Sequence, residues 1–273
     1  MTILQAFILG IIQGITEFLP ISSSAHLVLI PHFFNWQLVE EFVFPFDVLV
    51  QVGTLIAVLV FFREDLYKIV KGFIVGIFCK KPFGTRDSRM GWYIILASIP
   101  AGIAGLMLED GIDQAFHNPI AAGAFLIFTA GLLFLAERIG TNTRDIEEMK
   151  WNDSLWIGVS QILALFPGVS RSGATITGGM TRNINRADAT RFSFLMFVPI
   201  MFAAGVLSVY RLSGMPNLVE FLPILLVGFF TSLIIGYLSI RWLIKYLQSK
   251  PLTIFSLYCL ILGLFTLIYT YVS

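Results

Sequence analysis

The stretch QGITEFLPISSSAHL, residues 13–27, places polar chemistry in the middle of an apolar region. It contains a carboxylate at Glu17, a proline at Pro20, three consecutive serines and a histidine at His26. Each flanking apolar half is too short to cross a bilayer, which takes about 20 helical residues. Irregular backbone at membrane depth is tolerated only where protein or a water-filled cavity satisfies it. The stretch therefore predicts a broken helix whose polar tip lies inside the protein.

Composition places the chain in a membrane. Of its 273 residues, 57% are hydrophobic and only 13% are charged, which is about half the charged share of a soluble domain. The mean hydropathy is +0.84. We therefore expect an all-α integral membrane protein that forms a single domain. Six segments are long and apolar enough for full transmembrane helices, at 46–62, 91–108, 119–136, 190–211, 220–243 and 252–272.

A second broken region resembles the first. Residues 153–185 are apolar but are interrupted by FPGVSRSGATITGG, residues 166–179, just as residues 3–35 are interrupted by FLPISSSA. Upstream of the breaks, GIIQGI resembles GVSQIL. We interpret both regions as re-entrant helix–loop–helix hairpins, each followed by three spans, in two repeats of about 1–140 and 150–273. Three spans are an odd number, so the second repeat is inverted, an architecture that places binding sites at the midplane.

The charges orient these segments. Most Lys and Arg residues lie in the loops 63–90 and 137–152 and in the stretches 182–191 and 241–250. Together these segments hold all but two of the chain's 18 Lys and Arg residues. The expected topology puts all four on one face, which the positive-inside rule makes cytoplasmic. Both termini are then outside, and the chain starts without the basic residues of a cleaved signal peptide. Cys79 and Cys259 have no framework or metal spacing, so we expect free thiols.

The two breaks hold groups suited to an anion. Ionisable groups are costly in a bilayer, so Glu17, Arg171 and His26 are functional candidates. Arg171 offers a planar fork of donors that matches phosphate, and each break starts a half-helix whose free N–H groups attract anions. The structural alternatives are a simple Glu17–Arg171 ion pair and serines that only cap helices. The whole set predicts a phosphate or diphosphate site that also includes Ser22, Ser23, Ser24, Ser170, Ser172 and Thr175.

Further side chains suggest reactive roles. His26 follows Ser23 by three residues on one helix face, where it could serve as general base for a serine nucleophile or as general acid. Gln13 and Glu17 are four residues apart and present two oxygens, which together with substrate phosphates could hold Mg²⁺ or Ca²⁺. The other two histidines, His32 and His117, fall at expected helix ends or loops and are interpreted as interfacial.

At these motifs the chain resembles the undecaprenyl-diphosphate phosphatase family, the integral-membrane bacitracin-resistance type. The family's first motif reads roughly (E/Q)GxTEFLPxSSxxH, and residues 13–26 read QGITEFLPISSSAH. The second reads PGxSRSxxT, and residues 167–175 read PGVSRSGAT. A further similarity is FSFLMFVP at 192–199, and the likeness covers essentially the whole chain.

The resemblance implies a hydrolase in the bacterial plasma membrane, with its site open to the outside. It would remove the terminal phosphate of undecaprenyl diphosphate and so return the lipid carrier used for peptidoglycan and other wall polymers. It also implies dependence on a divalent cation. Many members have Glu where this chain has Gln13, which leaves Glu17 as the only carboxylate of the motif. The expected site residues are Glu17, Ser22, Ser23, Ser24, His26, Ser170, Arg171 and Ser172.

The expected mechanism is phosphoryl transfer governed by charge stabilisation. Arg171 and the half-helix N-termini hold the diphosphate, and Ser23 or a water attacks the terminal phosphorus. His26 relays the proton, while Glu17 holds the metal or orients the nucleophile. The expected partners are a prenyl diphosphate lipid and the bilayer, with no nucleic acid, and a homodimer is left open. The alternative function is a lipid-carrier transporter or flippase, alone or as a second role.

Overall fold

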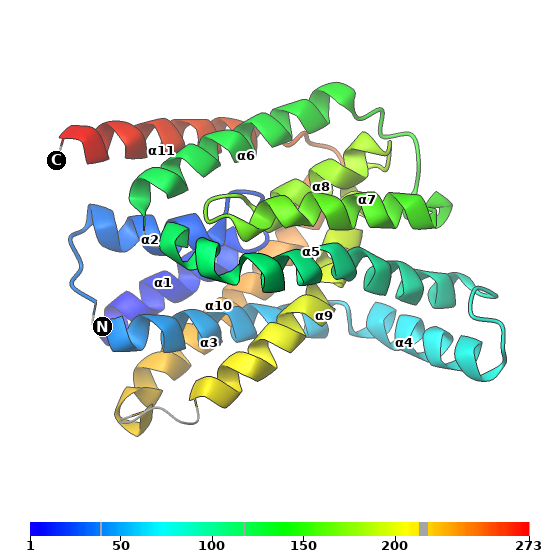
Figure 1. Ribbon diagram of the computed structural model, residues 1–273, viewed down its shortest axis with the longest axis horizontal. Helices are drawn as coiled ribbons and strands as arrows, with labels where there is room; N and C mark the ends of the chain where they lie inside the picture. The colour runs from blue at the N-terminus through cyan, green and yellow to red at the C-terminus, as the bar shows by residue number, and fades with distance from the viewer. Residues whose placement is uncertain (39, 117, 213–217, 273) are drawn as a thin grey trace.

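The computed structural model describes residues 1–38, 40–116, 118–212 and 218–272 as a bundle of helices (Figure 1). In chain order these are α1 (Ile3–Thr16), α2 (Ser23–Phe33), α3 (Glu40–Phe61), α4 (Arg63–Phe78), α5 (Arg86–Phe116), α6 (Pro119–Ile139), η1 (Ile146–Glu148), α7 (Trp151–Ile162), η2 (Leu163–Leu165), α8 (Arg171–Thr181), α9 (Arg186–Leu212), α10 (Leu218–Leu247) and α11 (Thr253–Val272).

The structure confirms an all-α membrane protein. Among the described residues, five helices are long and apolar enough to cross a bilayer, and a sixth crossing is obtained if the bent pair α3–α4 counts as one span. Five of the six spans expected from the sequence coincide with these helices, and the expected span 46–62 falls on α3, which qualifies only together with α4. Large apolar side chains such as Ile261, Leu264 and Ile268 of α11 are exposed on the outer surface of the bundle, as lipid-facing positions require. His117, one of the residues interpreted as interfacial, lies outside the described residues.

Residues 63–78 correct one expectation, because they form helix α4 where the sequence analysis placed a loop. The helix begins with Glu64 and Asp65 in its first turn, where acidic groups favour the helix dipole. It leaves α3 at a bend of 78°. Its charged residues masked an apolar face, which weakened the hydropathy signal. Cys79 follows α4 as an exposed free thiol, and Cys259 is a buried free thiol, as expected.

The two broken regions are confirmed as pairs of short helices. α1 and α2 are separated by the turn that contains Pro20, and α7 and α8 by a short 3-10 turn and the turn that contains Pro167. Proline cannot donate a backbone hydrogen bond and so weakens a helix at these turns, although Pro100 lies inside α5, so the polar residues around Pro20 and Pro167 also contribute to the breaks. Figure 1 shows α1 and α2 at one end of the molecule, α7 and α8 toward the other, and both turns near the middle.

Glycines let the first helix of each pair pack closely on a long helix. A Cβ added at Gly10 of α1 would lie 2.8 Å from the backbone oxygen of Gly228 in α10. A Cβ added at Gly158 of α7 would lie 2.3 Å from the backbone oxygen of Ala97 in α5. Small residues at helix contacts are how membrane helices approach one another closely. Gly10 and Gly158 occupy matching positions in GIIQGI and GVSQIL.

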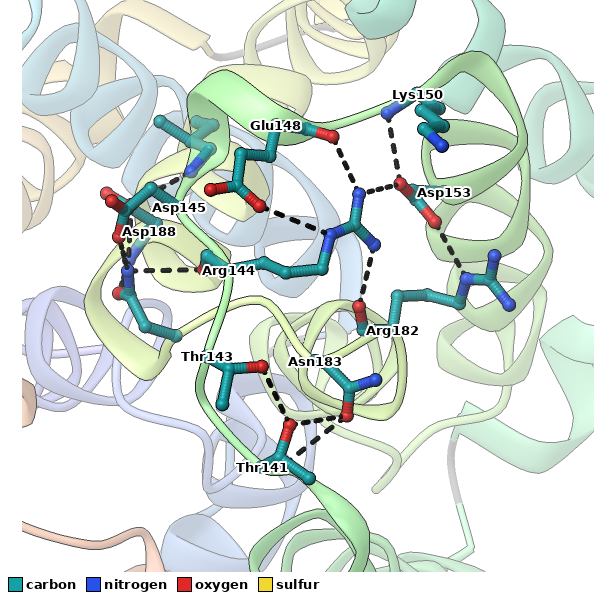
Figure 2. A network of polar contacts seen from close by, with 12 residues as sticks. Thr141, Thr143, Arg144, Asp145, Glu148, Lys150, Asp153, Arg182, Asn183 and Asp188 are labelled. Atoms are coloured by element: carbon teal, nitrogen blue, oxygen red, sulfur yellow. Dashed lines mark hydrogen bonds and ion pairs between the residues drawn. The ribbon is translucent and has the colours of Figure 1, made fainter.

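A buried carboxylate ties together the two ends of the second hairpin (Figure 2). Asp153, at the start of α7, is fully buried and accepts hydrogen bonds at 2.8 Å from both Arg144 and Arg182. Arg182 follows α8, and Arg144 also donates to its carbonyl at 3.0 Å. Burial works against the ionised carboxylate, but the hydrogen bonds from the two arginines outweigh it and hold the pKa of Asp153 below its usual range.

Removing this carboxylate should loosen the second hairpin. We expect Asp153→Asn to lower the free energy of unfolding at pH 7 by about 3 kcal/mol, because it leaves two arginines without their charge partner. Because the pKa of Asp153 is lower in the folded than in the unfolded state, its ionised carboxylate stabilises the fold at pH values above the unfolded-state pKa of about 4. This stabilisation is lost as the pH falls through the folded-state pKa. Wild type and variant should therefore converge below pH 4 when unfolding is followed in detergent.

Glu148→Gln is the matched control for this prediction. Glu148 lies 3.9 Å from Arg144 and its side chain is 60% exposed, so its loss should cost less than about 1 kcal/mol. Equal unfolding curves for Asp153→Asn and wild type at pH 7 would contradict the role given to this network.

Candidate functional site

Each break begins a half-helix with a serine cap. Ser22 caps α2 by accepting from the Ala25 backbone N–H at 3.4 Å, and Ser170 caps α8 by accepting from Gly173 at 3.1 Å. These two hydroxyls therefore have the capping role that the sequence analysis weighed against substrate binding. Ser22 adopts a φ of 68°, a conformation that costs energy for a residue with a side chain and that is concentrated at functional sites.

Glu17 accepts hydrogen bonds from residues of both breaks. It caps the C-terminus of α1 and is only 7% exposed. Gln13 donates to its Oε2 from 2.8 Å, and the Ser23 hydroxyl donates to the same oxygen from 2.7 Å. The other carboxylate oxygen, Oε1, accepts from the guanidinium of Arg171. Glu17 therefore joins the serine of the first break to the arginine of the second.

Arg171 stands at the first position of α8 and reaches across to the first hairpin. Its ion pair with Glu17 joins the two hairpins, and its guanidinium carbon lies 4.3 Å from the centre of the Phe197 ring, a cation–π contact. The ring covers one face of the guanidinium and its N–H groups remain at the edge. The Arg171 side chain keeps 24% of its surface exposed, so it can still meet a ligand.

Ser24 and Ser172 form hydrogen bonds between the two hairpins. The Gly168 N–H donates to Ser24 at 3.4 Å, and Ser172 donates to the carbonyl of Leu19 at 3.3 Å. Thr129 of α6 holds the second break from behind, donating to Gly168 and accepting from the N–H of Ser170, both at 3.1 Å. The half-helix starts are thus fixed against each other before any ligand binds.

Both ring nitrogens of His26 have partners other than Ser23, so the general-base role suggested by their shared helix face stays a prediction. Its Nδ1 lies 2.7 Å from the Ser22 carbonyl oxygen, and its Nε2 lies 2.8 Å from the Tyr258 hydroxyl of α11. A carbonyl only accepts, so Nδ1 carries a proton, and in a neutral ring Nε2 then accepts from the Tyr258 hydroxyl. The acceptor beside the Ser23 hydroxyl is therefore Glu17.

Thr175 is also directed away from the site. Its hydroxyl donates to the carbonyl of Arg171 at 2.8 Å and lies 2.6 Å from the hydroxyl of Ser193 in α9. The side chain is 1% exposed. Thr175 therefore fixes α8 against α9. The sequence had instead predicted that its hydroxyl would bind the diphosphate.

Gln13 and Glu17 do not form a ready cation site. The Nε2 group of Gln13 faces Glu17, while its Oε1 is buried and accepts no hydrogen bond from the described residues. The guanidinium of Arg171 occupies the other side of the carboxylate. Within the described part of the chain, no three His, Cys, Asp or Glu residues gather as metal ligands. The side chains present thus do not by themselves fit a divalent cation.

A cavity of about 200 Å³ opens beside Arg171. Its polar lining comes from Arg171, from Ser24 and from two glutamines, and the rest of the wall is aliphatic. α2, α3, α5, α7, α8, α9 and the segment between α7 and α8 all contribute. The lining residues are Ser24, Gln51, Ala101, Gln161, Ala164, Leu165, Val169, Arg171, Ile200 and Met201.

Four residues of this region were missed by sequence reasoning. Gln161 had a usable signal, because GVSQIL aligns it with Gln13, and Gln51 is an isolated amide in an otherwise apolar part of α3. Thr129 and Tyr258 gave no signal, since each lies in an ordinary apolar span. They join the site only because α6 and α11 pack against the broken helices.

The fold and the site define a class: a multi-pass membrane protein with a hydroxyl-rich, arginine-containing site where two broken helices meet. The chain matches the family described as bacitracin resistance protein BacA over residues 6–265, and it belongs to that family. Three relatives are each named undecaprenyl-diphosphatase. The protein of Methanosphaera stadtmanae is 40% identical, over 97% of both chains. That of Thermomicrobium roseum is 41% identical over 98% of both, and that of Pelodictyon phaeoclathratiforme is 42% identical over 96% of this chain and 95% of its own.

The His26–Tyr258 contact predicts a single tautomer of the imidazole. In ¹⁵N-labelled protein we expect His26 to carry its proton on Nδ1, with Nε2 unprotonated, because the Ser22 carbonyl can only accept. Tyr258→Phe removes the hydroxyl that donates to Nε2 and should shift that resonance alone. Tyr271→Phe, on the same helix at a position 92% exposed, is the control and should change neither nitrogen. A proton found on Nε2 in wild type would overturn this assignment.

Proposed function

We propose that this protein hydrolyses undecaprenyl diphosphate to undecaprenyl phosphate and inorganic phosphate, and so returns the lipid carrier to cell-wall polymer synthesis. The observation that carries the proposal is the convergence of Ser23, Glu17 and Arg171 from two helix breaks. This set supplies a nucleophile, a base and a phosphate-binding cation at one point. The names of the relatives and the bacitracin-resistance family agree with it.

Substrate binding would rearrange the ion pair. A diphosphate carries more charge than a carboxylate and offers the same planar pairs of oxygens to a guanidinium. It therefore competes with Glu17 for Arg171, while the N–H groups at the starts of α2 and α8 stabilise its charge. Once Arg171 bonds to phosphate, Glu17 loses its strongest partner and becomes a better proton acceptor.

The released carboxylate is placed to activate Ser23, whose hydroxyl already donates to it at 2.7 Å. In the proposed step Ser23 Oγ forms a bond to the terminal phosphorus, its proton passes to Glu17, and the bond to the bridging oxygen breaks. The leaving group is a prenyl phosphate anion, which needs no proton to depart. Water then hydrolyses the phosphoserine. The proton-relay role that the sequence gave to His26 passes in this proposal to Glu17.

A divalent cation remains a proposal for the assay to test. Because Gln13 and Glu17 do not supply a site alone, any cation would rely on the oxygens of the diphosphate. We assign it no step in the reaction.

The repeat and its orientation are part of the same proposal. We infer that α1 and α2 re-enter the outer face and that α7 and α8 re-enter the cytoplasmic face, as an inverted repeat. The close packing of Gly10 on α10 and of Gly158 on α5 supports equivalent positions for α1 and α7. Both termini lie at one end of the molecule, and the Lys- and Arg-bearing connections α4–α5 and α6–α7 lie at the other (Figure 1).

Phosphate release by purified protein in detergent tests the function. With farnesyl and undecaprenyl diphosphates as substrates, we expect turnover in wild type and a loss of at least about a thousandfold in Arg171→Ala, because transition-state charge loses its main cation. Arg171→Lys should recover only a small part of the lost activity, since lysine lacks the planar set of N–H donors that a guanidinium offers to phosphate. Chelator is added in a parallel arm.

Three results would decide against parts of this mechanism. Normal turnover by Arg171→Ala would refute the site. Full activity in Ser23→Ala, with no trapped phosphoserine in wild type, would make water the nucleophile. A transporter that does not hydrolyse its cargo would release no phosphate in detergent, where no gradient exists.

Single-cysteine labelling tests the orientation. With a membrane-impermeant maleimide on intact cells, we expect Gln37→Cys, in the α2–α3 connection, to react in a background that lacks Cys79. Native Cys79 and Thr143→Cys, in the α6–α7 connection, should react only after permeabilisation. All three sites are exposed. Reaction of Thr143→Cys from the same side as Gln37→Cys would rule out the inverted arrangement.

A further inference from the structure

The cavity beside Arg171 holds two amides that the mechanism above does not use. Gln161 of α7 is only 3% exposed, and its amide forms no hydrogen bond with the described residues although it lines the cavity. Gln51 of α3 is half-buried and lines the same cavity from another helix. An amide can donate N–H groups to a ligand and accept through its oxygen. Two amides that face one space from different helices therefore suit a polar ligand that pairs with them.

The size of the cavity limits what that ligand can be. A single ordered water needs about 10–15 Å³ of cavity measured in this way, and this cavity has about 200 Å³. It therefore has room for a phosphate group together with several waters, but not for a whole undecaprenyl chain.

The donors around the cavity suit an anion. Arg171 carries the charge, Ser24 offers a hydroxyl and the two glutamines offer N–H groups. Glu17 does not line the cavity and is ion-paired with Arg171. Asp47 precedes Gln51 by one helical turn but does not line the cavity. The aliphatic part of the wall lowers the local polarity, and this strengthens each hydrogen bond to a charged oxygen.

We propose that Gln161 and Gln51 form a subsite for the terminal phosphate, the group that is attacked and then leaves as inorganic phosphate. This inference rests on the proposed hydrolysis. Ser23 approaches the phosphorus from the Glu17 side and the lipid phosphate departs opposite to it. The amides bind the oxygens that lie off this axis, together with Arg171. The subsite distinguishes a diphosphate from the monophosphate product, because only the diphosphate carries a second phosphate to fill it.

Product inhibition separates this subsite from the rest of the site. With purified protein and farnesyl diphosphate, the inhibition constants of inorganic phosphate and of farnesyl phosphate are measured for each variant. Gln161→Leu should weaken inhibition by inorganic phosphate about tenfold, the usual effect of losing one hydrogen bond to a charged group. Gln161→Glu, almost identical in shape, should weaken it further by repulsion. Inhibition by farnesyl phosphate should change less than about twofold.

Gln248→Leu makes the same chemical change on the exposed surface beyond α10 and should alter neither constant. Gln51→Leu repeats the test from the opposite wall if Gln161→Leu fails to fold.

Unchanged inhibition by inorganic phosphate in the Gln161 and Gln51 variants would overturn the subsite, as would equal weakening of inhibition by both products. Tighter binding of farnesyl phosphate to Gln161→Leu would assign the cavity to the prenyl chain instead. Failure of the proposed function is distinguishable, because wild type would then release no phosphate.

Discussion

Glu17 and Arg171 meet at the ends of two broken helices, and the site depends on their ion pair. Neither charge could sit in the interior of a membrane protein alone, because an unpaired ion there is strongly disfavoured. Together they compensate each other and join hairpins that are far apart in the chain. The same pair presents a cation beside a carboxylate next to a serine hydroxyl, which is the minimum needed for phosphoryl transfer through an attacking serine.

The surrounding structure holds this pair in place. Thr129 fixes the second break from α6, and Tyr258 holds His26 from α11. Asp153 secures the far ends of α7 and α8, so the tip that carries Arg171 is anchored at its base. Catalysis by electrostatic stabilisation requires groups that are already oriented before the substrate arrives. The contacts of these three residues supply that rigidity.

Much of the fold could be predicted from the sequence because it follows from local rules. Apolar length defines the spans, and the two helices break at polar stretches that contain Pro20 and Pro167. The helix α4 was not predicted because its charged residues at 63–71 interrupt the apolar pattern. The partners of His26 and Ser23 could not be predicted, because three-residue spacing gives a shared helix face but not a side-chain direction. Ser23 turns toward Glu17, and His26 turns toward Tyr258.

The sequence by itself determined that the chain crosses a membrane, that two helices break, and that Glu17, the serines and Arg171 belong to the breaks. These conclusions depend only on covalent neighbours and on the cost of polar groups in a bilayer. Only the tertiary structure decided which groups touch. It brought Gln51 and Gln161 to one cavity and turned Thr175 toward Ser193. Such contacts depend on how distant helices pack and rotate against one another, and no local pattern encodes that choice.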